Sequence, residues 1–349
     1  MTGRALLLAP SRGLGGGIER YVDTLEWAFI AEGIECRRVD LGRPGRQAHV
    51  RMLTEARKHL RASPEPTRLV LAHRCLLPVA LLLAREPAAH GISVVCHGSD
   101  VWGARLRPRW HVEQRLMLRP AVRVVAVSSF TSGALSGRAP ATVLPPGLSR
   151  EWFETLVKAS GDETAGEPGI ALITAFRLAD WRDKGLPQLL DAVAALGRPD
   201  IRVTVCGSGE PSPDLLRLVA KHQRCILRPG LTDSELAHQL AAADLFVLAT
   251  RTRPGRRPSG EGFGLVLLEA QVAGTPVVGP AYGGSHDAFI ERITGVAPAD
   301  ETTEALAKVL GELLRDPRGL AQMGRRASEW ARECFAPERY ASRAVARLL

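Results

Sequence analysis

Short apolar runs alternate with amphipathic segments along most of the chain, and this alternation restricts the fold more than any other feature. Residues 5–10, 67–73 and 122–128 have the length and composition of buried strands. Residues 18–33 carry apolar side chains at helical spacing, and Gly33 provides a natural end to that helix. Such alternation predicts parallel sheets with helices covering both faces.

One segment interrupts the alternation. Residues 160–168, GDETAGEPG, are acidic and glycine-rich and have no periodicity, so we expect a linker there. The alternation restarts with a predicted strand at 170–176, and the last predicted helix covers 318–347. A chain of 349 residues is long enough for two cores. The expected parts are an N-terminal Rossmann-like domain (1–160), a second Rossmann-like domain (161–330) and a C-terminal helix packing toward the first domain (331–349).

The overall composition is that of a globular protein. Apolar residues make up 45% and charged residues 24% of the chain, and no run approaches the ~20 apolar residues of a membrane span. Glycines follow the first apolar run where a signal peptide would have its cleavage site, so we expect a cytoplasmic protein. The six cysteines include no CxxC pair, which predicts free thiols and no zinc site.

Positive charge is concentrated in the first part of the chain. Residues 1–150 contain 22 Lys and Arg against 11 Asp and Glu, whereas residues 151–349 contain 24 against 26. The basic part could attract a membrane surface, a phosphorylated acceptor or nucleic acid, or it could be a basic face without a partner. Aromatic residues are only 5% and form no basic-aromatic platform, which argues against nucleic acid.

Several predicted strands are followed by loops that could bind a ligand, because doubly wound sheets bind ligands beyond the carboxyl ends of their strands. The loop SRGLGGG (11–17) could approach a phosphate, although it lacks the GxGxxG and Walker spacings and could be a plain surface turn. His97 and Asp100 follow the predicted strand at 92–98. A histidine at that position can face a ligand or serve as a structural residue.

The second half offers cations and carboxylates in its loops. Arg177 and Lys184 follow a predicted strand end and suit a diphosphate. Glu261 precedes the glycine turn GFG, and Glu269 lies in the helix that follows. The amides of Gly264 and Leu265 begin that helix and can receive an anion, while carboxylates suit hydroxyl groups.

Taken together, these motifs resemble the retaining glycosyltransferases of family 4. The family pattern EGFGLxxxEAxAxGxPVV followed by a GG turn reads EGFGLVLLEAQVAGTPVVGPAYGG at residues 261–284. Arg177, Lys184-Gly185, the turn at Gly207 and Gly209, GGIERYV and HGSD also match. The resemblance implies an α/β protein with the GT-B fold, in which two Rossmann-like domains face each other across a cleft.

The resemblance also implies an activity and its residues. The activity is transfer of a sugar, with retained configuration, from a nucleotide-sugar donor (a UDP- or GDP-sugar) to a hydroxyl of a small-molecule, natural-product or lipid-linked acceptor. No metal and no cofactor is expected. The implied roles are catalysis for Glu261 and His97; donor diphosphate for Arg177, Lys184, Gly16, Gly17, Gly264 and Leu265; donor sugar for Glu261, Gly262 and Phe263; nucleoside for Glu269, Leu231 and Gly207; and acceptor for Asp100 and Arg12.

Other interpretations stay open at this stage. A nucleotide-sugar 2-epimerase would share the scaffold, whereas a dinucleotide oxidoreductase would need the GxGxxG motif that residues 11–17 lack. Residues 105–120 are basic and carry apolar side chains, so they could contact a membrane peripherally or form a core-packing helix. The arginine-rich residues 251–260 could form a flap or contact the acceptor. Nothing in the sequence predicts an oligomeric state.

Overall fold

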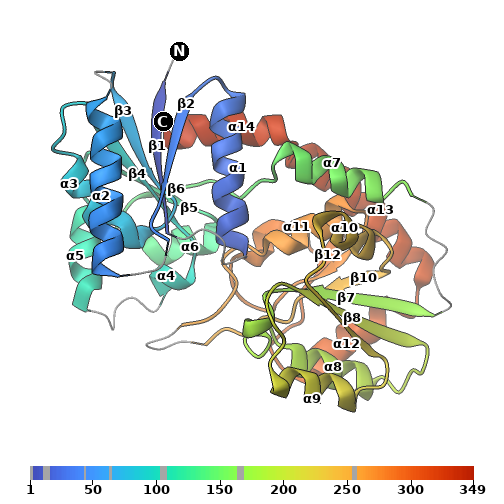
Figure 1. Cartoon of the computed structure of the whole chain (residues 1–349). Coiled ribbons are helices and arrows are strands. Elements are labelled where there is room, and N and C mark those ends of the chain that lie inside the picture. The colour runs from blue at the N-terminus through green and yellow to red at the C-terminus, as the bar shows by residue number, and fades with distance from the viewer. Residues whose placement is uncertain are drawn as a thin grey trace. The chain divides into compact units, whose positions relative to one another are not determined.

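The computed structural model describes residues 3–10, 16–42, 45–62, 65–102, 108–162, 169–253 and 258–349. The chain forms two compact units (Figure 1). Unit 1 contains Met1–Ser149 and the C-terminal segment Pro337–Leu349, and unit 2 contains Arg150–Arg253 and Ser259–Ala336. The chain thus passes from unit 1 to unit 2 between Ser149 and Arg150, earlier than the expected boundary at residue 160.

Unit 1 is built on a parallel six-stranded sheet in the order β2-β1-β3-β4-β5-β6. Its strands are β1 (Arg4–Ala9), β2 (Glu35–Asp40), β3 (Thr67–Leu71), β4 (Ala89–Cys96), β5 (Val122–Ala126) and β6 (Ala141–Val143). Its helices are α1 (Gly17–Ala31), α2 (Arg46–Arg61), α3 (Leu77–Leu83), α4 (Ser99–Trp102), α5 (Pro108–Met117), α6 (Ser129–Leu135) and α14 (Pro337–Leu348).

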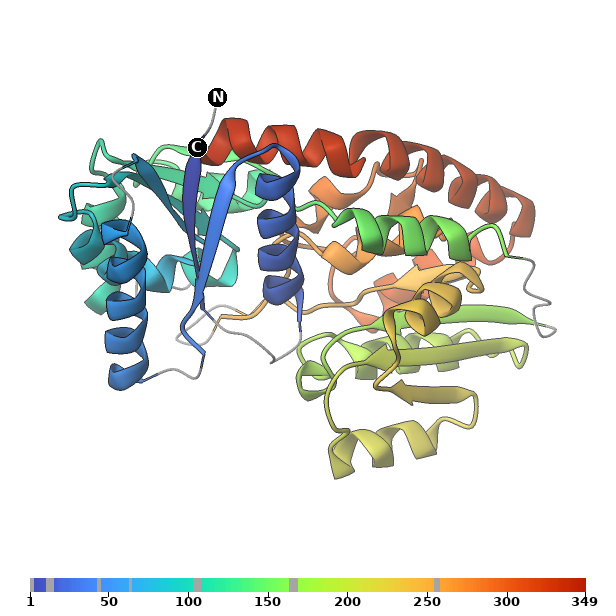
Figure 2. The same cartoon turned by 45° about the horizontal axis from the view of Figure 1, so that its top comes forward.

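Both faces of this sheet are buried at its centre, which explains why β1 and β3 are apolar runs rather than alternating ones. Leu6 and Leu8 of β1 pack with Met52 of α2 in one hydrophobic cluster. Leu7 is equally buried but lies outside that cluster, because successive strand residues point to opposite faces. Figure 2 shows α2 on one side of the sheet and α1 with α14 on the other.

The C-terminal region forms two helices where one was predicted over residues 318–347. Helix α13 (Pro317–Cys334) ends before Pro337, and α14 begins at Pro337. That prediction was wrong because proline lacks an amide proton and disfavours helical backbone at the residue before it. Helix α14 belongs to unit 1, where Ser342 donates a 2.7 Å hydrogen bond to Glu32, the residue that follows α1.

Unit 2 contains a second parallel sheet, in the order β12-β11-β10-β7-β8-β9. Its strands are β7 (Ile170–Ala175), β8 (Ile201–Gly207), β9 (Cys225–Pro229), β10 (Leu245–Val247), β11 (Val277–Val278) and β12 (Gly295–Val296). Its helices are α7 (Arg150–Ala159), α8 (Leu186–Ala195), α9 (Pro213–Lys221), α10 (Asp233–Ala241), α11 (Leu265–Val272), α12 (Thr303–Leu313) and α13. Figure 1 shows α8, α9 and α12 on one side of this sheet and α7, α10 and α11 on the other.

The order of the strands identifies where each sheet can bind a ligand. In unit 2 the chain starts in the middle at β7, builds outward to β8 and β9, and then returns to β10 on the other side. The neighbouring ends of β7 and β10 therefore form the topological switch point, where doubly wound sheets bind ligands. In unit 1 the corresponding neighbours are β1 and β3.

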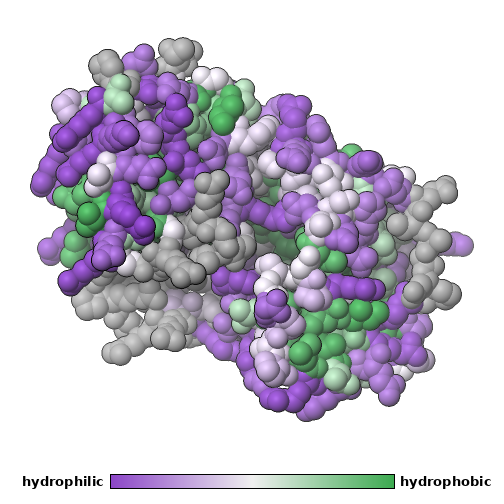
Figure 3. Space-filling model, in the orientation of Figure 1, coloured by the Kyte–Doolittle hydropathy of each residue, from purple (hydrophilic) through white to green (hydrophobic). Residues whose placement is uncertain are grey.

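The face drawn in Figure 3 is largely hydrophilic, with separate hydrophobic areas. Among the described residues, no helix combines the length and the apolarity that crossing a membrane requires.

We predict that Gly185→Ala destabilises the protein much more than Gly197→Ala. The two glycines flank α8 and have similar positive φ angles of 71° and 63°. A Cβ at Gly185 would lie 1.9 Å from the carbonyl oxygen of Ala249, whereas one at Gly197 would meet nothing within 4 Å. We expect about 1 kcal/mol for Gly197→Ala from its φ angle alone and about 3 kcal/mol or more for Gly185→Ala. Calorimetric melting of both variants checks this, and equal losses would contradict the packing argument.

Candidate functional site

An ion pair lies at the switch point of unit 2. The Lys184 ammonium donates to the Glu261 carboxylate, with 2.8 Å between Nζ and Oε2. The hydroxyl of Thr250, which follows β10, donates to the same oxygen at 3.0 Å. Thr250 is buried, whereas the Lys184 and Glu261 side chains keep 24% and 13% of their surface exposed. A ligand can therefore reach both charged groups.

Close backbone approaches hold this pair in place. Gly185 lets the loop carrying Lys184 lie against Ala249 after β10, where no Cβ would fit. On the other side, the Glu261 carbonyl accepts a 2.8 Å hydrogen bond from the amide of Gly284. A Cβ at Gly283 would lie 2.7 Å from that carbonyl, so the GG turn needs glycine here.

Helix α11 begins directly after this pair. Gly264 is its N-cap, in left-handed conformation with φ 82°, and Leu265 is its first residue. The free amides at such a helix end carry partial positive charge. Phe263 is buried and its ring lies 6.1 Å from that of Phe335, so its side chain serves packing. In this turn, the groups available to contact a sugar are therefore the backbone and the Glu261 side chain.

Glu269 lies on the second turn of α11 and is 4% exposed. Its Oε1 accepts a hydrogen bond of 3.0 Å from the indole nitrogen of Trp152 on α7. The sequence analysis predicted Glu269 as a binding residue and overlooked Trp152, because nothing in the sequence pairs two residues 117 positions apart.

The turns after β7, β8 and β9 lie close together. Gly230 donates a 2.9 Å hydrogen bond to the carbonyl of Gly207, and Leu178 donates to Ser208 at 2.9 Å. A Cβ at Gly207 would lie 2.1 Å from the Phe176 carbonyl. Leu231 directly follows Gly230, so the two predicted nucleoside-binding positions, Gly207 and Leu231, belong to adjoining turns.

Arg177 has a different partner from Lys184. Its guanidinium pairs with Asp180 at 2.8 Å and is 47% exposed. Asp183, next to Lys184, pairs with Arg253 at 3.0 Å and so connects this loop with the start of the arginine-rich segment. Arg177 is thus exposed beside the switch point without contacting the Lys184–Glu261 pair directly.

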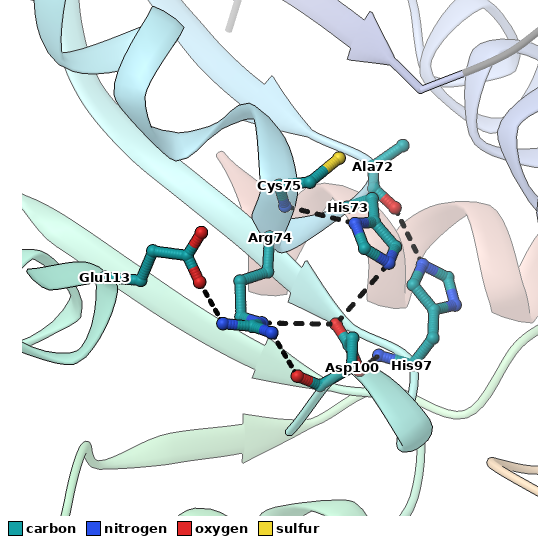
Figure 4. A network of polar contacts seen from close by, with 7 residues as sticks. All are labelled: Ala72, His73, Arg74, Cys75, His97, Asp100 and Glu113. Atoms are coloured by element: carbon teal, nitrogen blue, oxygen red, sulfur yellow. Dashed lines mark hydrogen bonds and ion pairs between the residues drawn. The ribbon is translucent and has the colours of Figure 1, made fainter. Parts of the chain in front are cut away.

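In unit 1, the loop after β4 carries His97, and Figure 4 shows the polar network around it. His97 Nε2 lies 2.7 Å from the carbonyl oxygen of Ala72, which follows β3. Because a carbonyl only accepts, Nε2 carries the proton in the neutral ring and Nδ1 is left as an acceptor. The ring stacks on His73 at 5.9 Å and meets Tyr21 edge-on at 5.0 Å.

A buried ionic network holds the loop that carries His97. Arg74 donates to the Glu113 carboxylate and to the carbonyl of Asp100 (Figure 4). Asp100 is 8% exposed, and its Oδ1 accepts a 3.0 Å hydrogen bond from the backbone amide of His97. Its Oδ2 lies 3.8 Å from His73 Nε2. The carboxylate of Asp100 therefore orders the His97 loop, and its role in acceptor binding stays a prediction.

The sequence analysis identified only part of this network. His73 follows β3 as His97 follows β4, and these two strands are neighbours. Since ligands bind beyond the carboxyl ends of such strands, the same reasoning that selected His97 could have selected His73. Arg74 and Glu113 gave no such signal. Gly16 is the N-cap of α1 and Gly17 its first residue. The predicted acceptor residue Arg12 lies outside the described residues.

Burial, together with the nearby His73, lowers the pKa of His97 to about 4 against the opposing effects of Asp100 and the Ala72 carbonyl. The ring is therefore neutral at physiological pH and can act as a hydrogen-bond acceptor through Nδ1. Among the described residues, no group of three His, Cys, Asp or Glu side chains is arranged to hold a metal ion.

We predict that His97 makes folding pH-dependent between about pH 6.5 and about pH 4. In that range the unfolded chain binds a proton at His97 that the folded chain does not, so stability falls as the pH falls. His97→Gln should flatten this part of the pH profile, and exposed His90→Gln should leave it unchanged. Denaturant unfolding at several pH values measures this. A His97→Gln profile as steep as that of the wild type would refute it.

Comparisons with known proteins identify the family. The family described as glycosyl transferases group 1 matches residues 169–330. A GDP-mannose-dependent alpha-(1-6)-phosphatidylinositol monomannoside mannosyltransferase of Mycolicibacterium smegmatis is 31% identical over 269 residues, covering 73% of this chain and 69% of that protein. A D-inositol 3-phosphate glycosyltransferase of Streptomyces avermitilis is 32% identical, covering 57% of this chain and 44% of that protein.

Solved structures agree on the fold. Sucrose-phosphate synthase from Thermosynechococcus elongatus superposes with a TM-score of 0.77 at 20% identity, covering 99% of this chain and 98% of that one. Anabaena HepE in complex with UDP and glucose gives a TM-score of 0.73 at 17% identity, covering 98% of both chains. The chain therefore belongs to the group 1 glycosyltransferases, and its two α/β units form the predicted GT-B fold.

Proposed function

We propose that this glycosyltransferase moves a mannosyl group from GDP-mannose to a hydroxyl of an acceptor containing inositol phosphate, with retained anomeric configuration and without a metal ion. One observation carries the proposal: Lys184, Glu261 and Thr250 meet at the switch point of unit 2, directly before α11. A cation, a carboxylate and a helix N-terminus are the groups that a sugar diphosphate requires.

In this proposal, positive groups stabilise the departing diphosphate. Lys184 exchanges part of its interaction with Glu261 for a phosphate oxygen, and Arg177 adds its exposed guanidinium. The amides of Gly264 and Leu265 supply further donors. A phosphate contact by the amides of Gly16 and Gly17, at the start of α1, stays a prediction. These fixed charges and dipoles replace a metal ion, because they stabilise the charge that develops when the bond to the sugar breaks.

The carboxylates have a different task. Glu261 accepts hydrogen bonds from hydroxyls of the transferred sugar, and Thr250 keeps its carboxylate oriented. Glu269 accepts hydrogen bonds from the ribose, and the adjoining turns at Gly207 and Leu231 lie along the base. An anionic carboxylate only accepts hydrogen bonds, which suits it to hydroxyl donors and not to phosphate.

Retention follows if the nucleotide leaves from the same face that the acceptor attacks. The acceptor hydroxyl forms the new bond to the anomeric carbon as the bond to the diphosphate breaks, and its proton passes to the leaving phosphate. No enzyme nucleophile is needed. We assign to neutral His97 a hydrogen bond, accepted through Nδ1, from a substrate hydroxyl.

The relatives support the choice of substrates. Two mannosyltransferases, from Mycolicibacterium smegmatis and Corynebacterium glutamicum, are named as GDP-mannose-dependent and as acting on phosphatidylinositol monomannosides. Others are named as D-inositol 3-phosphate glycosyltransferases, so inositol phosphate is the chemistry common to both groups. The excess of 22 basic over 11 acidic residues in positions 1–150 favours such an anionic acceptor, free or at a membrane surface. The 2-epimerase alternative has no support from these relatives.

We predict that Lys184→Ala reduces transfer by about 100-fold or more, because it removes a charge that stabilises the leaving diphosphate. Glu261→Ala should reduce transfer similarly by removing the contact with the sugar. Both variants should remain folded, since these side chains are partly exposed. Lys308→Ala, on the exposed face of α12, is the control. Product formation measured by mass spectrometry tests this, and full turnover by either variant would refute the proposed site.

We predict that GDP raises the melting temperature of the protein more than UDP, ADP or GMP does, because a ligand of the folded state stabilises it. The GMP comparison isolates the second phosphate. Transfer from GDP-mannose to inositol phosphate should continue in excess EDTA, and NMR of the product should show the same anomeric configuration as the donor. A larger rise in melting temperature with UDP would change the donor assignment. Loss of activity in EDTA would refute the metal-independent mechanism.

A further inference from the structure

Trp152 and Glu269 form a polar contact inside unit 2. The indole of Trp152 is the donor, the distance to Oε1 is 3.0 Å, and the residues are 6% and 4% exposed. Trp152 lies in the first turn of α7, and Glu269 lies on the second turn of α11, the helix that begins at the proposed diphosphate position. The contact therefore joins α7, which has no proposed ligand role, to α11, which carries the carboxylate proposed to bind the ribose.

The chemistry of the donor matters here. An indole N–H can donate one hydrogen bond and accept none, so it holds a carboxylate without neutralising its charge. A lysine or arginine at this place would compete with the substrate for the same oxygens. A carboxylate can accept about four hydrogen bonds, so the one from Trp152 occupies only part of what the Glu269 carboxylate can accept.

Trp152 also reduces the freedom of the carboxylate. A glutamate side chain has several rotatable bonds, and fixing them on ligand binding costs entropy. A buried, rigid indole that already holds Oε1 removes part of that cost before the nucleotide arrives. The ion pair of Lys184 and Glu261 has no part in this contact, so the two carboxylates of the site are oriented by separate means.

We propose that Trp152 is a positioning residue for the nucleoside, which fixes Glu269 so that its carboxylate accepts hydrogen bonds from the ribose hydroxyls. This inference rests on the proposed function, in which Glu269 contacts the ribose. It differs from a packing role in one measurable respect. A positioning residue affects binding only through the ribose hydroxyls, whereas loss of packing weakens every nucleotide equally.

The test compares GDP with 2′,3′-dideoxy-GDP, which lacks both ribose hydroxyls. Calorimetric titration gives the dissociation constants for the wild type, Trp152→Phe and the control Trp330→Phe. Trp330 is a second tryptophan of unit 2, packed against Phe335 on α13. We expect the wild type to prefer GDP, Trp152→Phe to bind GDP about three- to tenfold more weakly, and its affinity for dideoxy-GDP to stay within about twofold. Trp330→Phe should leave both constants unchanged.

A second measurement uses the intact protein and stays informative if Trp152→Phe does not fold. The indole N–H signal of Trp152 is assigned in ¹⁵N-tryptophan NMR spectra by elimination, using variants of the other five tryptophans. GDP should shift this signal and dideoxy-GDP should shift it much less. Equal shifts with both nucleotides would overturn the inference.

The remaining outcomes separate this inference from the proposed function. Equal weakening of both nucleotides in Trp152→Phe would overturn the positioning role and leave the donor assignment intact. A wild type that binds GDP and dideoxy-GDP equally well would also overturn it, because Glu269 would then not contact the ribose. Failure of the wild type to bind any nucleoside diphosphate would refute the proposed function itself, and the inference with it.

Discussion

The parallel hydrogen-bonded register of the two sheets is the constraint on which the rest of the structure depends. Parallel pairing requires every strand to run in the same direction, so all carboxyl ends lie along one edge. The loops that follow β7 and β10 then become neighbours, although Lys184 and Glu261 are 77 residues apart in the chain. The chemistry of the site therefore follows from the order of the strands.

Opposite charges at the switch point are compatible with folding because each has a partner before a ligand arrives. A lone buried ammonium or carboxylate would be costly, but Lys184 and Glu261 neutralise each other at 2.8 Å and remain partly exposed. An incoming diphosphate offers Lys184 a second acceptor, while a sugar offers Glu261 new donors. The ion pair thus keeps both groups oriented near the geometry that the proposed reaction needs.

The His97 loop illustrates a different use of buried charge. Arg74, Asp100 and Glu113 are each less than 10% exposed, and Asp100 connects this network to the backbone of His97, whose ring stays neutral. Removing one of these charged side chains would leave its buried partner with less compensating charge. That loss of stability exceeds what the intact ion pair contributes. The network is thereby suited to fixing the backbone of the loop, and the imidazole is left to accept a hydrogen bond.

Sequence patterns alone predicted most strands, most helices and the family, because apolar runs, glycine turns and the EGFG motif are local signals. Their positions after strand ends selected Lys184 and His97, and the EGFG motif selected Glu261. The strands β6 and β12 and the helices α4, α6 and α7 were not among the predicted elements. Only the tertiary structure decided that Thr250 orients Glu261, that Trp152 holds Glu269 and that Asp100 binds the His97 backbone. The contact between Trp152 and Glu269 joins residues 117 positions apart, and the other two, over 11 and 3 positions, depend on how loops fold. Packing selects such partners, and local patterns cannot.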